Sequence, residues 1–221
     1  MTISVRTSTA IPDCRTPKLT RWASYAGLMS FFGDYLDKKV PHPPTPTGRG
    51  ISRNDIARDG YAVVLPGLLP WTGVVGRSES ACVAVTGVRC WPEFAQLSLT
   101  TYHRNGQGTH MLTMPRFHED AEEILRFGVL FADGRRATNL DHLAWNDGAP
   151  RNPPADHPVL FPAGGSGWAG RTEIQVSLFP LPPAGPVTLI VEWPAEGIAE
   201  SRTEFDGAEM RAAAEQAERI W

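Results

Sequence analysis

The sequence predicts a mainly β protein: an antiparallel immunoglobulin-like β-sandwich with an N-terminal amphipathic helix and a C-terminal helix. Apolar and polar residues alternate with a period of two in several short runs, and Gly- and Pro-containing turns separate these runs. No helical pattern alternates with the strands, which disfavours a parallel α/β sheet. With 42% apolar residues among 221, the chain is long enough to bury a core of ordinary size.

The strand predictions depend on this alternation. Every second residue is apolar in residues 187–193 and in residues 125–131, and an Asp133-Gly134 turn follows the second run. Further strands are predicted at residues 81–89, 93–103, 171–179 and 199–205, with a weaker candidate at 61–65.

An amphipathic helix is predicted over residues 19–36, before the strands begin. Aromatic and apolar side chains recur there at helical spacing and form one face: Trp22, Tyr25, Met29, Phe32 and Leu36. Four prolines in residues 41–48 then predict an extended connector. We therefore divide the chain into an N-terminal segment (1–40), a Pro/Gly-rich connector (41–58) and a β-sandwich domain with its C-terminal helix (59–221).

The C-terminal helix is predicted from a capping pattern. Asp206 is a good N-cap residue, and Glu209 follows three positions later, where its carboxylate can reach back to the N–H of the cap. Behind them runs a modest apolar stripe: Met210, Ala213, Ala214, Ala217 and Trp221.

Composition and charge bear on the compartment and on the kind of partner. The three cysteines form no C-x-x-C pair, and neither a signal-peptide core nor an 18-residue apolar run occurs, so we expect a cytoplasmic protein without a transmembrane segment. The net charge is −3. Residues 1–58 carry nine Lys or Arg against four Asp, a balance of +5, so association with nucleic acid through this segment is one alternative function.

The stretch Gly165-Ser-Gly-Trp-Ala-Gly170 matches the G-x-G-x-x-G pattern of dinucleotide-binding loops. Such a loop must open a helix, whereas the residues after Gly170 alternate as a strand does. The pattern therefore predicts no nucleotide site and no cofactor. We interpret it as a flexible loop between strands that exposes Trp168, a residue type enriched at binding hot spots.

A histidine-rich stretch raises metal binding as a second alternative. His103, His110 and His118 lie within 16 residues, but their intervals match no i, i+4 metal-binding pair. We find no nucleophile motif either, so no catalytic residue is predicted. The leading hypothesis is a non-enzymatic interaction or assembly protein that contacts a protein partner or a second copy of itself. Its predicted contact residues are the aromatic helix face, with Trp22, Tyr25, Met29, Phe32 and Leu36, together with Trp168. The alternatives are a metal-dependent enzyme or binding module and a nucleic-acid-associated protein.

The C-terminal three quarters of the chain resemble a group of actinobacterial β-sandwich proteins without an established function. The resemblance is carried by the glycine stretch at 164–170, the turn "PLPPAGP" and the strand pair around "EWPAEGIAE". It covers about residues 60–221 and implies a bacterial cytosolic origin, but no activity, cofactor or site residue.

Overall fold

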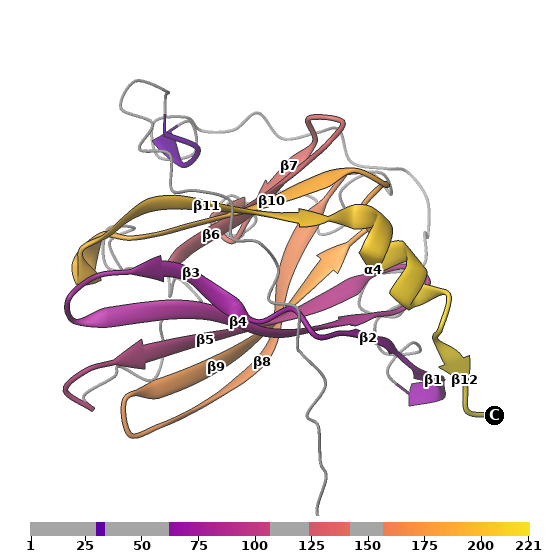
Figure 1. Cartoon of the computed structure of the whole chain (residues 1–221), viewed down its shortest axis with the longest axis horizontal. Helices are drawn as coiled ribbons and strands as arrows, with labels where there is room; N and C mark the ends of the chain where they lie inside the picture. Colours follow the sequence, from indigo (N-terminus) through magenta and orange to yellow (C-terminus); the bar gives the residue numbers. More distant parts are fainter. Residues whose placement is uncertain (1–29, 34–61, 107–123, 142–156) are drawn as a thin grey trace, which may run out of the picture.

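In this computed structural model the alternating runs of the sequence form the strands of two antiparallel sheets, and a helix follows near the C-terminus (Figure 1). The structure describes residues 30–33, 62–106, 124–141 and 157–221. The larger sheet has the order β2-β4-β5-β9-β8, and β3 also pairs with β4. Its strands are β2 (Gly67–Leu69), β3 (Gly73–Arg77), β4 (Ala81–Cys90), β5 (Ala95–His103), β8 (Val159–Trp168) and β9 (Arg171–Phe179).

The smaller sheet has the order β11-β10-β6-β7. Its strands are β6 (Arg126–Phe131), β7 (Arg136–Thr138), β10 (Pro186–Trp193) and β11 (Ile198–Asp206), and the short 3-10 helix η1 (Pro194–Glu196) joins β10 to β11. A separate pair joins β1 (Val64–Leu65) to β12 (Glu218–Arg219).

The two sheets form layers that face each other across one apolar core (Figure 1). In the smaller sheet Leu189 lies opposite Val129 and Val191 lies opposite Phe127, so the alternating apolar positions of β10 and β6 share a face. These side chains are buried in one cluster with those from the larger sheet: Val83, Val85, Leu97, Leu99, Ile174, Val176 and Leu178. Burial of each such side chain stabilises the fold by about 1.5–3 kcal/mol. The mainly β, antiparallel prediction is confirmed.

The C-terminal helix α4 (Gly207–Ala214) begins at the predicted cap. The Asp206 carboxylate accepts a hydrogen bond from the N–H of Ala208 at 2.8 Å. Glu209 does not close a capping box; its carboxylate accepts a hydrogen bond from the indole N–H of Trp71 at 2.8 Å and ties the helix to the chain before β3. The helix also ends earlier than its apolar stripe predicts, because the following residues leave it to pair with β1, and Trp221 is 83% exposed.

The prediction of a loop at residues 164–170 is wrong in one respect, because most of these residues belong to β8. Gly165 pairs with Ile174, and Trp168 pairs with Arg171. Only Ala169 and Gly170 form the turn, with φ of 47° and 78°, the positive values that a tight two-residue hairpin turn requires. A strand does follow the glycine motif, as predicted. Glycine gives no alternating pattern, so the strand before the turn is recognisable only from its pairing with β9.

The N-terminal predictions fall mostly on residues outside the described part of the chain. Of the predicted helix 19–36, the structure describes only residues 30–33, where the N–H of Gly33 donates to the carbonyl of Ser30 at 3.1 Å. The connector at 41–58 lies outside the described residues.

A partly buried carboxylate follows β7. Asp141 accepts a hydrogen bond from the backbone N–H of Thr138 at 2.9 Å, and so ties the end of the strand to the turn that follows. Burial raises the pKa of Asp141 from 3.8 to about 6, although the Thr138 N–H and the charge of Arg136 act in the opposite direction. The native state therefore favours the protonated carboxyl.

We expect the contribution of Asp141 to the stability of the wild type to fall as the pH rises from 4 to 7.5, because a raised native pKa stabilises the fold below the unfolded value and that gain is lost through pH 6. Asp141→Asn cannot titrate and keeps an acceptor for Thr138. Since one pKa unit corresponds to about 1.4 kcal/mol, the wild type should lose on the order of 2 kcal/mol relative to this variant across the range. Urea denaturation at both pH values measures the difference.

Asp133→Asn, in the turn between β6 and β7, is the matched control. The side-chain hydrogen bond from Arg135 lowers the pKa of Asp133, so its titration lies below pH 3.8 and should not alter stability between pH 4 and 7.5. A stability difference between Asp141→Asn and wild type that is equal at both pH values would contradict the prediction.

Candidate protein-interaction surface

The most exposed aromatic side chain of the described strands lies at the end of the β8–β9 hairpin. Trp168 is 85% exposed, and residues 163–169 are all exposed. In Figure 1 this hairpin extends along the margin of the larger sheet, where β8 is the last strand. The sequence prediction that Trp168 is presented to solvent is therefore met, on a strand end rather than on a loop.

Trp168 begins a row of side chains that crosses the outer face of the larger sheet. Directly paired residues of neighbouring strands point to the same face. Trp168 pairs with Arg171, Arg171 with Tyr102, and Tyr102 with Cys82. The Arg171 guanidinium lies 5.9 Å from the centroid of the Tyr102 ring, and Tyr102 is 40% exposed. The row thus presents two aromatic rings and one cation to solvent.

On the same face, hydrogen bonds between β5 and β9 hold the polar side chains next to Trp168 in place. Glu173 accepts from Arg171 at 3.3 Å and from the Gln175 amide at 2.7 Å. Gln175 in turn accepts from the hydroxyl of Ser98 at 2.9 Å. This chain of hydrogen bonds runs from β5 through β9 and restrains the side chains next to the β8 edge. The exposed Arg171–Glu173 ion pair contributes little to stability, so we assign this series of hydrogen bonds a positioning role.

The backbone of β8 leaves hydrogen-bonding groups at the open edge. In a two-residue hairpin the residues that flank the turn, here Trp168 and Arg171, exchange both backbone hydrogen bonds, and the pattern then alternates. Trp168 and Ser166 therefore direct their N–H and C=O groups toward β9. Gly165 and Gly167 direct theirs away from it, to the side on which no described strand pairs with β8.

Phe32, another predicted contact residue, has a different environment. Its side chain is 0% exposed and packs in a second apolar cluster on the outer face of the smaller sheet. The other members of the cluster are Phe31, Ile124, Leu140 and Ile190. Phe32 therefore contributes to the chain's own fold, and its side chain is not accessible to a partner. The remaining predicted contact residues, Trp22, Tyr25, Met29 and Leu36, lie outside the described residues.

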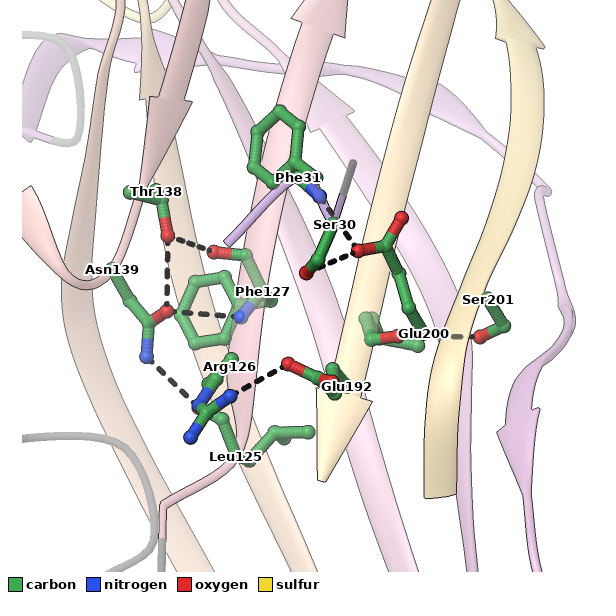
Figure 2. A network of polar contacts seen from close by, with 11 residues as sticks. Ser30, Phe31, Leu125, Arg126, Phe127, Thr138, Asn139, Glu192, Glu200 and Ser201 are labelled. Carbon is green, nitrogen blue, oxygen red and sulfur yellow. Dashed lines mark hydrogen bonds and ion pairs between the residues drawn. The ribbon is translucent and has the colours of Figure 1, made fainter. Parts of the chain in front are cut away.

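One carboxylate anchors the segment that carries Phe32 (Figure 2). Glu200 accepts hydrogen bonds from the hydroxyl of Ser30 at 2.9 Å and from the backbone N–H of Phe31 at 2.7 Å. Arg202 holds the same carboxylate through a 2.8 Å ion pair. Gly128 lies beneath the Phe31 ring, where an added Cβ would overlap Cε1 of that ring. The glycine therefore creates the space that Phe31 occupies.

A second group of polar contacts in Figure 2 holds the start of β6. Asn139 accepts from the N–H of Phe127 and donates to the carbonyl of Leu125, each at 2.9 Å, and Arg126 pairs with Glu192 at 2.7 Å. Asn139 is fully buried, so these bonds satisfy backbone groups that would otherwise lack partners. Sequence reasoning missed this network, because its donors and acceptors share no motif.

His103, the one described member of the metal-binding candidates, ends β5 and points into the protein. Its side chain is 6% exposed, Nδ1 lies 3.5 Å from a Glu196 oxygen, and the ring meets Trp193 edge-on. Nε2 has no hydrogen-bond partner. His110 and His118 lie outside the described residues. Within the part of the chain that the structure describes, no three His, Cys, Asp or Glu side chains gather as metal ligands would.

Comparison with known proteins finds no matching family model, no matching curated protein and no matching solved structure. The resemblance to actinobacterial β-sandwich proteins therefore stays a prediction. Among the described residues, no helix has the length and apolar character to cross a membrane.

We predict that Gly128→Ala destabilises the protein by about 1–3 kcal/mol, because the added methyl group forces the Phe31 ring out of its site. In the background of Phe31→Ala the same substitution should cost much less, because the overlapping ring is gone. Urea denaturation of the two single variants and the double variant measures this coupling.

Gly73→Ala is the matched control, because a Cβ at this strand glycine would meet nothing within 4 Å. If Gly128→Ala is as stable as Gly73→Ala, or if the two substitutions at 31 and 128 are simply additive, the docking of Phe31 over Gly128 is wrong.

Proposed function

We propose that this chain is a non-enzymatic protein-interaction module that binds an extended segment of a protein partner, or of a second copy, along the open edge of β8. The observation that carries the proposal is an 85% exposed tryptophan at the end of an edge strand whose outward backbone groups lack a described partner strand. Addition of a strand to a sheet edge is a common mode of peptide recognition, in which backbone hydrogen bonds supply affinity. Trp168 would supply the apolar anchor.

The contrast with the other edge strands supports this proposal. Natural sheets protect their edges with charged residues, prolines, bulges or short strands. β11, the corresponding edge of the smaller sheet, has four charged residues: Glu200, Arg202, Glu204 and Asp206. β2 and β7 have only three residues each, and β3 lies beside β11. β8 also contacts β7, but its residues 163–168 are all exposed. β8 has ten residues and no charge.

A bulge between Pro162 and Gly164 interrupts the first half of β8. Beyond this bulge, residues 164–168 keep regular pairing with β9 and have neither proline nor charge. These five residues are therefore the stretch that an added strand would use. Exposed edges of this kind promote association, and their retention in a folded protein is explained most simply by a binding role.

Two finer parts of the proposal concern architecture and compartment. The two facing sheets are consistent with an immunoglobulin-like sandwich. Cys82 and Cys90 are both free, which supports a reducing, cytoplasmic environment. The alternatives have less support: metal binding rests on His103 alone among the described residues, and the basic residues 1–58 lie almost entirely outside them.

Selection of peptides by the immobilised full-length chain tests the proposed function. From a random peptide library we expect enrichment of sequences that alternate apolar and polar residues, as an added strand would. Trp168→Ser should weaken binding of the selected peptides at least tenfold, because it removes the anchor. Ser166→Lys should do the same, because a lysine on an edge strand disfavours strand addition.

Two exposed positions away from the edge give matched controls. Trp221→Ser removes a tryptophan that is 83% exposed, and Thr72→Lys adds the same charge in an exposed loop. Both should bind the selected peptides as the wild type does. If no peptide is enriched and the chain also does not self-associate through β8, the proposed function is wrong.

A further inference from the structure

We infer that the strand which occupies the β8 edge is β8 of a second copy of this chain, paired antiparallel about a two-fold axis at Ser166. The inference rests on the proposed function and specifies its partner. A two-fold interface uses the same surface on both copies, so that surface must be complementary to itself. Residues 164–168, the part of β8 beyond its bulge, meet this requirement in their charge, their backbone pattern and their side-chain volumes.

The charge requirement is met because residues 164–168 contain no ionisable side chain. Antiparallel pairing of the stretch with itself therefore places no like charges opposite each other. β11 has four charged residues, so its self-pairing would need a register that places Arg202 opposite an acidic residue. Among the long edge strands of the described sheets, β8 is thus the one whose self-pairing requires no matching of charges.

The backbone requirement is met by the positions of Gly165 and Gly167. Both direct their N–H and C=O groups to the open edge, by the alternation that the hairpin turn sets. When Ser166 lies opposite Ser166 of the second copy, Gly165 lies opposite Gly167 of that copy. These two glycines then exchange both backbone hydrogen bonds, and the symmetry repeats the exchange on the other side of the axis.

The volume requirement is met by Trp168 and Gly164. In this register Trp168 of one copy lies directly opposite Gly164 of the other, and both belong to the outer face, as their pairing with Arg171 and Gln175 requires. Glycine has no side chain, so the indole ring can cover the backbone of the second copy and approach its Gln175. The chain thus provides both the aromatic ring and the space for it.

The contact is small, so we expect a weak interaction. Five residues of strand and two tryptophans bury less surface than the roughly 1,200–2,000 Å² of a stable interface. We therefore expect a weak dimer with a dissociation constant in the micromolar range, which forms and dissociates with concentration.

Sedimentation velocity of the full-length wild type over about 1–200 µM, a range chosen for micromolar affinity, provides the first test. We expect a reversible monomer–dimer equilibrium. Trp168→Ser and Ser166→Lys should each weaken dimerisation at least tenfold, whereas Trp221→Ser and Thr72→Lys should leave it unchanged. Circular dichroism and urea denaturation check that each variant is folded.

Cross-linking tests the register. Residues on the two-fold axis of an antiparallel pair have Cβ atoms about 4.5–5.5 Å apart, close enough for a disulfide to form with little movement. Ser166→Cys should therefore give a covalent dimer under mild oxidation, at a rate that rises with concentration and far exceeds that of Thr72→Cys. The wild type, with its native cysteines, gives the background.

The outcomes separate this inference from the proposed function. A chain that stays monomeric yet selects peptides through Trp168 overturns the second-copy inference and leaves strand addition in place. A dimer insensitive to Trp168→Ser and Ser166→Lys also overturns the inference, because another surface would then form it. A dimer that these variants weaken, but in which Ser166→Cys forms disulfides no faster than Thr72→Cys, overturns the register.

Discussion

The pairing of β5 with β9 is the constraint on which the rest of the larger sheet depends. It joins residues 69 to 83 positions apart in the chain, with Tyr102 opposite Arg171 and Ala95 opposite Leu178. Each strand already belongs to a local hairpin, β4–β5 or β8–β9, and their pairing merges the two hairpins into one sheet. Long-range pairing has a larger entropic cost than local pairing, and burial of the apolar inner faces of both strands offsets that cost.

The same pairing determines the position and the face of Trp168. Because β9 lies between β5 and β8, the β8 strand becomes the edge. Because the register places Arg171 beside Tyr102, the row that ends at Trp168 points away from the core. The exposure of this tryptophan is therefore a consequence of the topology, and a shift of one residue in the β5–β9 register would turn the row inward.

Sequence reasoning predicts well those features that depend on local patterns. The strand at residues 171–179 has the bounds of β9, and Asp206 caps α4, because alternation and capping are properties of neighbouring residues. The short strands β2, β3 and β7 give too few residues for a pattern. The predicted end of α4 is wrong for another reason, because residues 218–219 pair with β1, more than 150 positions away. That competing partner is not visible in the local sequence.

The predicted interaction site illustrates the same limit. Phe32 and Trp168 are both apolar aromatic residues predicted to contact a partner, yet one is 0% and the other 85% exposed. The difference arises from residues distant in sequence. Glu200 and Gly128 provide a hydrogen-bond acceptor and an unfilled space for the segment of Phe32, whereas no described residue covers Trp168. Spacing in the sequence identified the aromatic residues, but their surroundings in the fold decide which of them stays available.

The positions of nearby glycines explain the different environments of Phe31 and Trp168. Phe31 occupies the space that Gly128 leaves on its own sheet, and this contact is satisfied within one chain. Trp168 has its nearest glycines on its own strand, where they lie beside it along the edge and not beneath its ring. A strand cannot fold onto its own edge, and no described residue fills the space that Gly164 leaves, so this space is open to an added strand. Trp168 and Gly164 lie four positions apart on one exposed edge. The ring of Trp168 can therefore occupy the space beside a Gly164 only when two such edges pair.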